Sequence, residues 1–311
     1  MADRLHRAIL HRGAVAGVRQ RGVFGRHPRL PIAGATLRPH QLSTSKRPFG
    51  RGSEVKRRVL SAVLIAPPLV LFVLYGPPWA LGAVVLASAL LGLREFFLLT
   101  LRRWRWSWLA LGGIPVVASH WGVEVMVLGM ASAVTGSFSL GILRGSPSEG
   151  QREALLVTAG MAYISLPMAH LILAGRLPHG IKGILLLLAA VWTGDTLALM
   201  VGRRWGKRAL APRVSPKKTV EGALATFGGV GLAVLLLRPL CLPDLSPGAT
   251  LLFVLGVGIL SQIGDLSESL LKRAAGVKDS GGLIPGHGGM LDRMDSFIFT
   301  SPFLYYLLRA F

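Results

Sequence analysis

The chain has 311 residues, of which 51% are hydrophobic and 16% are charged, and its mean hydropathy is +0.54. This composition excludes an ordinary soluble domain and indicates a membrane protein. The single cysteine, Cys241, excludes an internal disulfide and a cysteine-based zinc cluster. The net charge of +21 suits an anionic partner, but no basic motif with interleaved aromatic residues accompanies it. We therefore expect no nucleic-acid partner.

The first part of the chain is strongly basic. Residues 1–58 hold fourteen Lys and Arg against Asp3 and Glu54. No apolar stretch typical of a secretory signal occurs before residue 59. We interpret residues 1–57 as a basic, disordered tail. An organellar transit peptide over residues 1–55 and docking on anionic lipids are the alternatives.

Apolar stretches that approach the length of a bilayer crossing recur along the rest of the chain. They predict an all-α polytopic membrane protein with about nine transmembrane helices, at residues 59–76, 79–100, 106–119, 123–143, 155–175, 181–202, 222–238, 249–264 and 296–310. Residues 58–180 would form N-terminal helices with little chemistry, and residues 181–311 a catalytic transmembrane region. Small residues in the spans permit a homodimer, but they serve packing within one subunit equally well.

The basic residues predict the orientation of the spans. Nine alternating spans that follow a cytoplasmic N-terminus place 30 Lys and Arg inside and 4 outside, with Arg94 near the inner end of its helix. The positive-inside rule favours this arrangement. It places two polar loops, residues 203–218 and 267–295, in the cytoplasm. We expect a bacterial inner membrane, or an organellar membrane if residues 1–55 are a transit peptide.

The acidic residues are distributed unevenly. Half of the fourteen Asp and Glu belong to one group near the C-terminus: Asp195, Glu221, Asp265, Glu268, Asp279, Asp292 and Asp295. Asp195 and Asp265 each follow a glycine in an apolar helix that leads into one of the polar loops. Because a carboxylate inside a membrane is costly, we expect both to be functional. Glu95, in the apolar sequence LREFF, is interpreted as structural, either as a partner of Arg94 or as a helix-end anchor.

The first polar loop contains seven Lys and Arg within residues 203–218. Such a loop suits the phosphates of a nucleotide or a lipid, and it also suits a loop that only fixes membrane topology. The sequence SPKKTVEG predicts a helix start with Ser215 as the cap, which would itself favour an anion. The substrate-binding candidates here are Ser215, Lys217, Lys218, Thr219 and Glu221, together with Asp195.

The second polar loop carries paired carboxylates at both of its ends. Asp265 and Glu268 lie three residues apart, so they share one helix face, and Asp292 and Asp295 repeat this spacing at the start of the last span. Four carboxylates from two helix ends could converge on one or two Mg²⁺ ions, which prefer oxygen ligands. These four residues are therefore the predicted metal ligands.

Glycines and cations fill the space between these carboxylates. Gly288 and Gly289 follow His287 in a predicted tight turn whose backbone amides can face phosphate oxygens. His287 could donate to a phosphate, act as a general acid, or only shape the turn. Arg293 could clamp a phosphate or neutralise the acids beside it. A solvated charged loop without function is the alternative.

The second polar loop resembles the complete signature of the phosphatidate cytidylyltransferases (CDP-diacylglycerol synthases). The matching residues are Ser269, Leu271, Lys272, Arg273, Lys278, Asp279, Gly281, Ile284, Pro285, His287, Gly288, Gly289, Met290, Asp292, Arg293, Met294 and Asp295. SPKKTVEG, GDLSES and the Trp-containing span around Asp195 are also similar, so the resemblance covers roughly residues 180–311 strongly.

This resemblance implies that CTP and phosphatidate react to give CDP-diacylglycerol and pyrophosphate at a Mg²⁺ site. It implies that Asp265 and Asp292 are the principal metal ligands, with Asp295 and Glu268 supporting them. Asp265, Asp292, Asp295, Lys272, Arg273 and His287 are then the catalytic candidates. Lys278, Asp279, Gly288, Gly289 and Arg293 join the substrate-binding candidates.

Two alternatives to this function are open. One is another CTP-dependent enzyme of the same superfamily, such as a polyprenol or phytol kinase or an ether-lipid cytidylyltransferase. The other is an ion-coupled transporter in which Asp195 and Asp265 bind the ion. Consumption of CTP separates the transporter from the enzymes.

Overall fold

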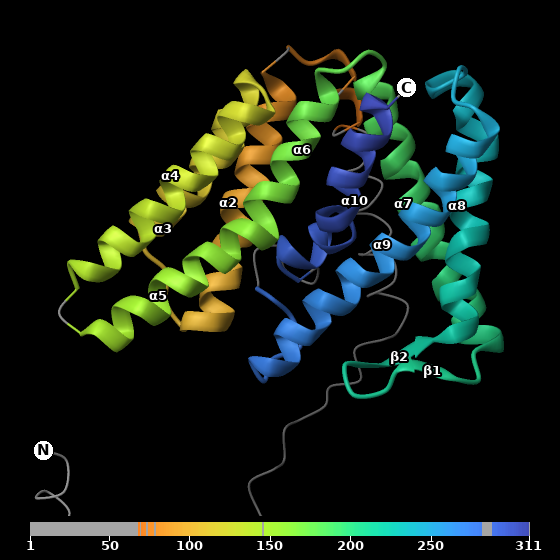
Figure 1. Ribbon diagram of the computed structural model, residues 1–311. Coiled ribbons are helices and arrows are strands. Elements are labelled where there is room, and N and C mark those ends of the chain that lie inside the picture. Colours follow the sequence, from red (N-terminus) through yellow and green to blue (C-terminus); the bar gives the residue numbers. More distant parts are fainter. Residues whose placement is uncertain are drawn as a thin grey trace, which may run out of the picture. The chain divides into compact units, whose positions relative to one another are not determined.

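The computed structural model describes residues 68–310, apart from residues 69, 73, 78, 145 and 282–287 (Figure 1). All of the described residues belong to one compact unit, residues 49–311. The predicted basic tail and most of the first predicted span, residues 59–76, lie outside the described residues.

The described part of the chain is almost entirely helical. Its α-helices are α2 (Ala80–Leu101), α3 (Trp106–Ala118), α4 (Val123–Ile142), α5 (Pro147–Gly160), α6 (Leu166–Gly175), α7 (Gly180–Trp205), α8 (Val220–Cys241), α9 (Pro247–Ala274) and α10 (Leu291–Arg309). A short 3₁₀ helix, Ser119–Trp121, follows α3, and a π-helical turn, Met161–Ser165, joins α5 to α6.

Within the described residues, six helical stretches are long and apolar enough to cross a membrane. They are α2, α4, the continuous stretch from α5 through α6, α7, α8 and α9. The prediction of a polytopic helical membrane protein is therefore confirmed, whereas the count of nine spans is not. The predicted span 106–119 is α3, whose 13 residues reach only about 20 Å at 1.5 Å per residue. The predicted span 296–310 lies within α10, which is not among these six stretches. Its first turns carry Asp292, Arg293 and Asp295, which lower its hydropathy.

Helix α10 occupies the middle of the bundle. It packs against α2, α6, α7 and α9, while α7 and α8 form a closely packed pair at one side (Figure 1). Glycine allows the closest contacts. A Cβ added to Gly229 of α8 would lie 2.6 Å from the Thr193 carbonyl oxygen of α7, and one added to Gly264 of α9 would lie 2.1 Å from the Asp295 carbonyl oxygen of α10. Both contacts lie within two residues of predicted site carboxylates.

A small β-hairpin, which the sequence did not predict, interrupts the helices of this otherwise all-α fold. Strands β1 (Ala209–Ala211) and β2 (Ser215–Thr219) pair antiparallel between α7 and α8. The predicted helix start at Ser215 is wrong, because that residue opens β2. Helix α8 begins four residues after Pro216, at Val220, with Thr219 as its cap: the threonine hydroxyl accepts a hydrogen bond from the Gly222 amide at 3.1 Å.

Candidate active site

Three carboxylates converge where α9 meets α10. Asp265 and Glu268 on α9 and Asp295 on α10 each place an oxygen within 4.8 Å of the others. The i, i+3 spacing puts the first two on one face of α9, and the glycine contact at Gly264 lets α10 approach closely enough for the third. The carboxyl group of Glu268 is almost completely buried, with 1% of the residue exposed. This cluster is the centre of the candidate site.

Two lysines offset part of this negative charge. Lys218, at the end of β2, forms an ion pair with Asp265. Lys272, one turn beyond Glu268 on α9, lies 2.5 Å from both a Glu268 oxygen and an Asp292 oxygen. Because the Lys272 side chain is only 13% exposed, solvent screens this bridge weakly. The bridge joins Asp292 to the carboxylate cluster indirectly, through a cation.

Asp292 is held mainly by donors of the second polar loop. Its Oδ2 accepts hydrogen bonds from the Ser280 amide at 3.1 Å, the Ser280 hydroxyl at 2.9 Å and the Gly289 amide at 2.8 Å. Gly288 has a φ of +76°, which favours glycine, and a Cβ there would lie 2.7 Å from the Asp292 carboxylate. Both glycines therefore serve Asp292: Gly288 leaves room for its carboxylate, and the Gly289 amide donates a hydrogen bond to it.

Glu95 of α2 reaches the same loop and takes a role that the sequence only partly suggested. Its carboxylate, 3% exposed, shares the single proton of the Ser280 hydroxyl, 2.8 Å away, with Asp292, and it accepts hydrogen bonds from the Met290 amide at 2.9 Å and the Leu291 amide at 2.8 Å. The last two amides begin α10, where unpaired donors and the helix dipole favour an anion. Glu95 is therefore a helix-end anchor, but for α10 rather than for its own helix. The feature of the sequence that indicated a structural role for Glu95 was a single acidic residue in an apolar helix.

The hairpin and the second polar loop meet at one end of the bundle. The Arg273 Nε donates to the Val214 carbonyl oxygen at 3.2 Å, which ties the end of α9 to the hairpin turn. Glu221 accepts from the Lys207 and Arg208 amides at 3.0 and 3.3 Å, which ties the start of α8 to the segment before β1. In Figure 1 the hairpin lies at the lower end of α7 and α8, the end at which α9 also terminates.

The remaining predicted residues belong to α7, the hairpin, the second polar loop and the start of α10. Asp195 is exposed on α7 and close enough to Asp265 for their charges to interact. Exposed side chains also include Lys217, Lys278, Asp279 and Arg293, whereas Ser215 is half-buried. His287 lies outside the described residues, so its role stays a prediction.

The carboxylate cluster fits a hard cation. Oxygen ligands are those that Mg²⁺ and Ca²⁺ prefer, and three carboxylates, two from α9 and one from α10, already lie together. The Oε1 atom of Glu268 is buried and has no hydrogen-bond partner among the described residues. A buried carboxylate oxygen without a partner is costly, so a ligand at this point would stabilise it. The residues present therefore fit a divalent cation.

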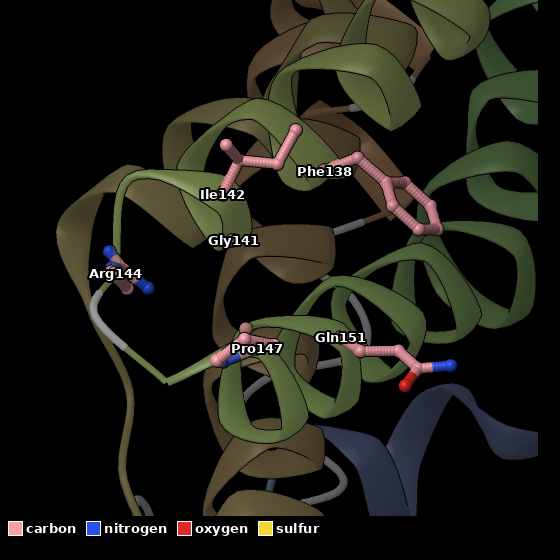
Figure 2. Close-up of a pocket in the computed structure, with 7 residues that line it drawn as sticks. Phe138, Gly141, Ile142, Arg144, Pro147 and Gln151 are labelled. Atoms are coloured by element: carbon pink, nitrogen blue, oxygen red, sulfur yellow. The ribbon is translucent and has the colours of Figure 1, made fainter.

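A separate cavity of about 340 Å³ lies at the junction of α4 and α5. Figure 2 shows lining residues from the end of α4, including Phe138 and Ile142, and from the start of α5, including Pro147 and Gln151. Arg144, also at its edge, forms an ion pair with the buried Glu153. No carboxylate of the cluster lines this cavity, so the chemistry points to the α9–α10 site instead.

Comparison with known proteins adds an independent line of evidence. A profile described as "Cytidylyltransferase family" matches residues 56–311. A Thermotoga maritima protein named phosphatidate cytidylyltransferase is 34% identical over 82% of this chain and 97% of its own length. An Arabidopsis thaliana protein, phosphatidate cytidylyltransferase 4, chloroplastic, is 30% identical over 88% of this chain and 78% of its own length.

A third relative, from Bacillus subtilis and named phosphatidate cytidylyltransferase, is 41% identical over 51% of this chain. The match spans 60% of that relative's length. The profile and the full-length matches cover both the helices and the site described above. The chain therefore belongs to the cytidylyltransferase family.

Proposed function

We propose that this protein transfers a cytidylyl group from CTP to phosphatidate, which gives CDP-diacylglycerol and pyrophosphate. The observation that carries the proposal is the convergence of Asp265, Glu268 and Asp295 beside the basic hairpin, in a chain of this family. Carboxylates for a cation and lysines for phosphates are the groups that phosphoryl chemistry requires. The names of the relatives support the choice of substrates.

The proposed reaction forms one bond and breaks one. An oxygen of the phosphatidate phosphate attacks the α-phosphorus of CTP, and the bond from that phosphorus to the bridging oxygen of the pyrophosphate breaks. Neither step needs a covalent bond to the protein. Positioning and charge neutralisation are then the main contributions of the enzyme.

The described residues suit these two tasks. Asp265, Glu268 and Asp295 would hold a divalent cation, which we propose to be Mg²⁺ and which would neutralise phosphate charge when bound. Asp292, bridged to Glu268 by Lys272, would support this set or add a ligand for a second ion. The position of Lys218 beside Asp265 suits contact with a phosphate of CTP.

The other basic residues would complete the binding of the two anionic substrates. Lys217, Arg273, Lys278 and Arg293 are all exposed, and the hairpin and the end of α9 lie at the same end of the bundle (Figure 1). His287, in the same signature, would add a donor. We propose that this end faces the cytoplasm, or the corresponding compartment of an organelle, because CTP is soluble and the basic loops favour that side.

Two differently labelled samples of CTP test the reaction. Purified protein in detergent is incubated with Mg²⁺, phosphatidate and CTP that is labelled at either the α- or the γ-phosphate. We expect the α-label in the lipid and the γ-label in pyrophosphate. Transfer of the γ-label to a lipid would identify a kinase and contradict the proposal. Parallel reactions with a polyprenol and an ether-linked phosphatidate identify the acceptor, and CTP left intact with every lipid would return the transporter to consideration.

A further inference from the structure

The π-helical turn Met161–Ser165 brings one more polar group to the candidate site. It interrupts the long stretch of α5 and α6, and a proline follows two residues after it, at position 167. Pro167 has no amide hydrogen, so it cannot donate the bond that a regular helix would direct to the Tyr163 carbonyl four residues earlier. Such turns often occur at functional positions, where the wider turn reorients a side chain.

Tyr163 lies at the middle of this turn. Its ring contacts those of Phe96 of α2 and Phe299 of α10, with both ring centroids 6.0 Å away. Phe299 follows Asp295 by one helical turn, and Phe96 follows Glu95 directly. The two aromatic contacts therefore fix the tyrosine against the two helices that carry the site.

The Tyr163 side chain lies near the carboxylate cluster, because its ring contacts Phe299, one helical turn after Asp295. Its hydroxyl is buried and has no hydrogen-bond partner among the described residues, and it is close enough to Asp295, Glu268 and Asp265 to interact electrostatically with them. Glu268 Oε1 is likewise buried without a partner. A donor and an acceptor, both without partners, thus belong to segments that contact α10. Since native proteins rarely leave such groups unsatisfied, a bound cation with its water ligands would satisfy both.

We propose that Tyr163 is a positioning residue for the cation site. Its hydroxyl donates a hydrogen bond to a carboxylate oxygen or a water of the cation that Asp265, Glu268 and Asp295 hold, and so orients the ligands. Outer donors of this kind commonly raise metal affinity by about 10-fold or more. The inference rests on the proposed function for the identity of the cation as Mg²⁺.

Tyr163→Phe tests the inference, since it removes the hydroxyl and keeps the ring. Tyr306→Phe is the matched control, because Tyr306 is 54% exposed near the far end of α10. Metal-free proteins in detergent are titrated with MgCl₂ while thermal unfolding is followed, and with Mn²⁺ while free Mn²⁺ is measured by electron paramagnetic resonance. We expect about 10-fold weaker binding of both ions by Tyr163→Phe, with an unchanged metal-free melting temperature and an unchanged control.

Kinetics provide a second measurement on the same variants. With CTP and phosphatidate, Tyr163→Phe should raise the KM for Mg²⁺ by about 10-fold and change kcat at saturating Mg²⁺ much less. Equal cation affinity in wild type and Tyr163→Phe would overturn the inference and leave the proposed reaction intact. A lower metal-free melting temperature would show a purely structural role. If the wild-type protein formed CDP-lipid but bound neither ion at this site, the inference would be overturned and the proposed reaction would still stand.

Discussion

At the scale of single residues, the site depends on buried carboxylates that are matched by specific donors. Glu95 shows this clearly, because its two oxygens receive three hydrogen bonds from the loop and from the start of α10. The Met290 side chain, at the position before α10, forms no capping bond. The Glu95 carboxylate, which comes from α2, takes the place of a capping residue. Through this contact, α2 fixes the helix that carries Asp292 and Asp295.

Replacing Glu95 with glutamine tests this anchor. The amide of Glu95→Gln would direct a donor at the amides and hydroxyl that now donate to Glu95, so we expect a loss of about 2 kcal/mol in the free energy of unfolding. Glu124→Gln is the control, since Glu124 is exposed in the first turn of α4, on a different helix from Glu95. Denaturant unfolding in detergent measures both variants. Equal stability of Glu95→Gln and wild type would contradict the anchoring role.

At the scale of elements, the site depends on how closely α9 and α10 approach. Gly264 lies directly before Asp265, and its missing side chain leaves room for the Asp295 carbonyl oxygen. Any larger residue would push the two helices apart at the carboxylate cluster. Gly248, near the start of the same helix, has no atom within 4 Å of an added Cβ.

These two glycines form a matched pair for mutation. Gly264→Ala should destabilise the protein by about 1–3 kcal/mol through overpacking and should weaken Mg²⁺ binding, because the helices must separate. Gly248→Ala should change stability little, or raise it slightly, because alanine favours the helix. Thermal unfolding with and without Mg²⁺ measures both effects. If Gly264→Ala matched Gly248→Ala in both stability and Mg²⁺ binding, the close contact at Gly264 would be unimportant.

The hairpin shows where local sequence patterns mislead. Ser215 followed by Pro216 has the chemistry of a helix start, yet these residues pair with β1, and the helix begins only after Thr219. Ser215 and Thr219 are both residues that commonly cap helices. The pairing of β2 with Ala209–Ala211 makes Thr219 the cap. That pairing cannot be recognised from a strand of three residues.

At the scale of the whole molecule, the sequence predicted the class of fold and three of the four carboxylates that it expected to converge, whereas the fourth, Asp292, is joined to them through Lys272. Long apolar runs identify spans by themselves, and the i, i+3 spacing identified Asp265 with Glu268. The contact between Glu95 and the start of α10 joins residues almost 200 positions apart, and the sequence carries no local signal for it. The bridge from Lys272 to Asp292 was missed for a different reason: Lys272 follows Glu268 by one helical turn, but its contact with Asp292 depends on how α9 packs against α10.

The arrangement of α7 to α10 predicts the sidedness of three loops. Arg213 in the hairpin and Asp279 in the second polar loop should face one side of the membrane, and Asp244 between α8 and α9 should face the other. Single cysteines at these positions, in a Cys241→Ser background, can be labelled with an impermeant maleimide in oriented vesicles. Labelling of positions 213 and 244 from the same side would contradict the arrangement.

The central claim is that the carboxylates at the meeting point of α9 and α10 perform cytidylyl transfer. The most direct test compares the rate of CDP-lipid formation by wild type, Asp265→Asn and Asp244→Asn, with folding of each checked by thermal unfolding. Asp244 is an exposed acid at the other end of α9, so its variant should keep the wild-type rate. We predict that Asp265→Asn loses about 100-fold, the scale on which removal of one charge-stabilising group affects catalysis. A folded Asp265→Asn protein with the wild-type rate would contradict the account.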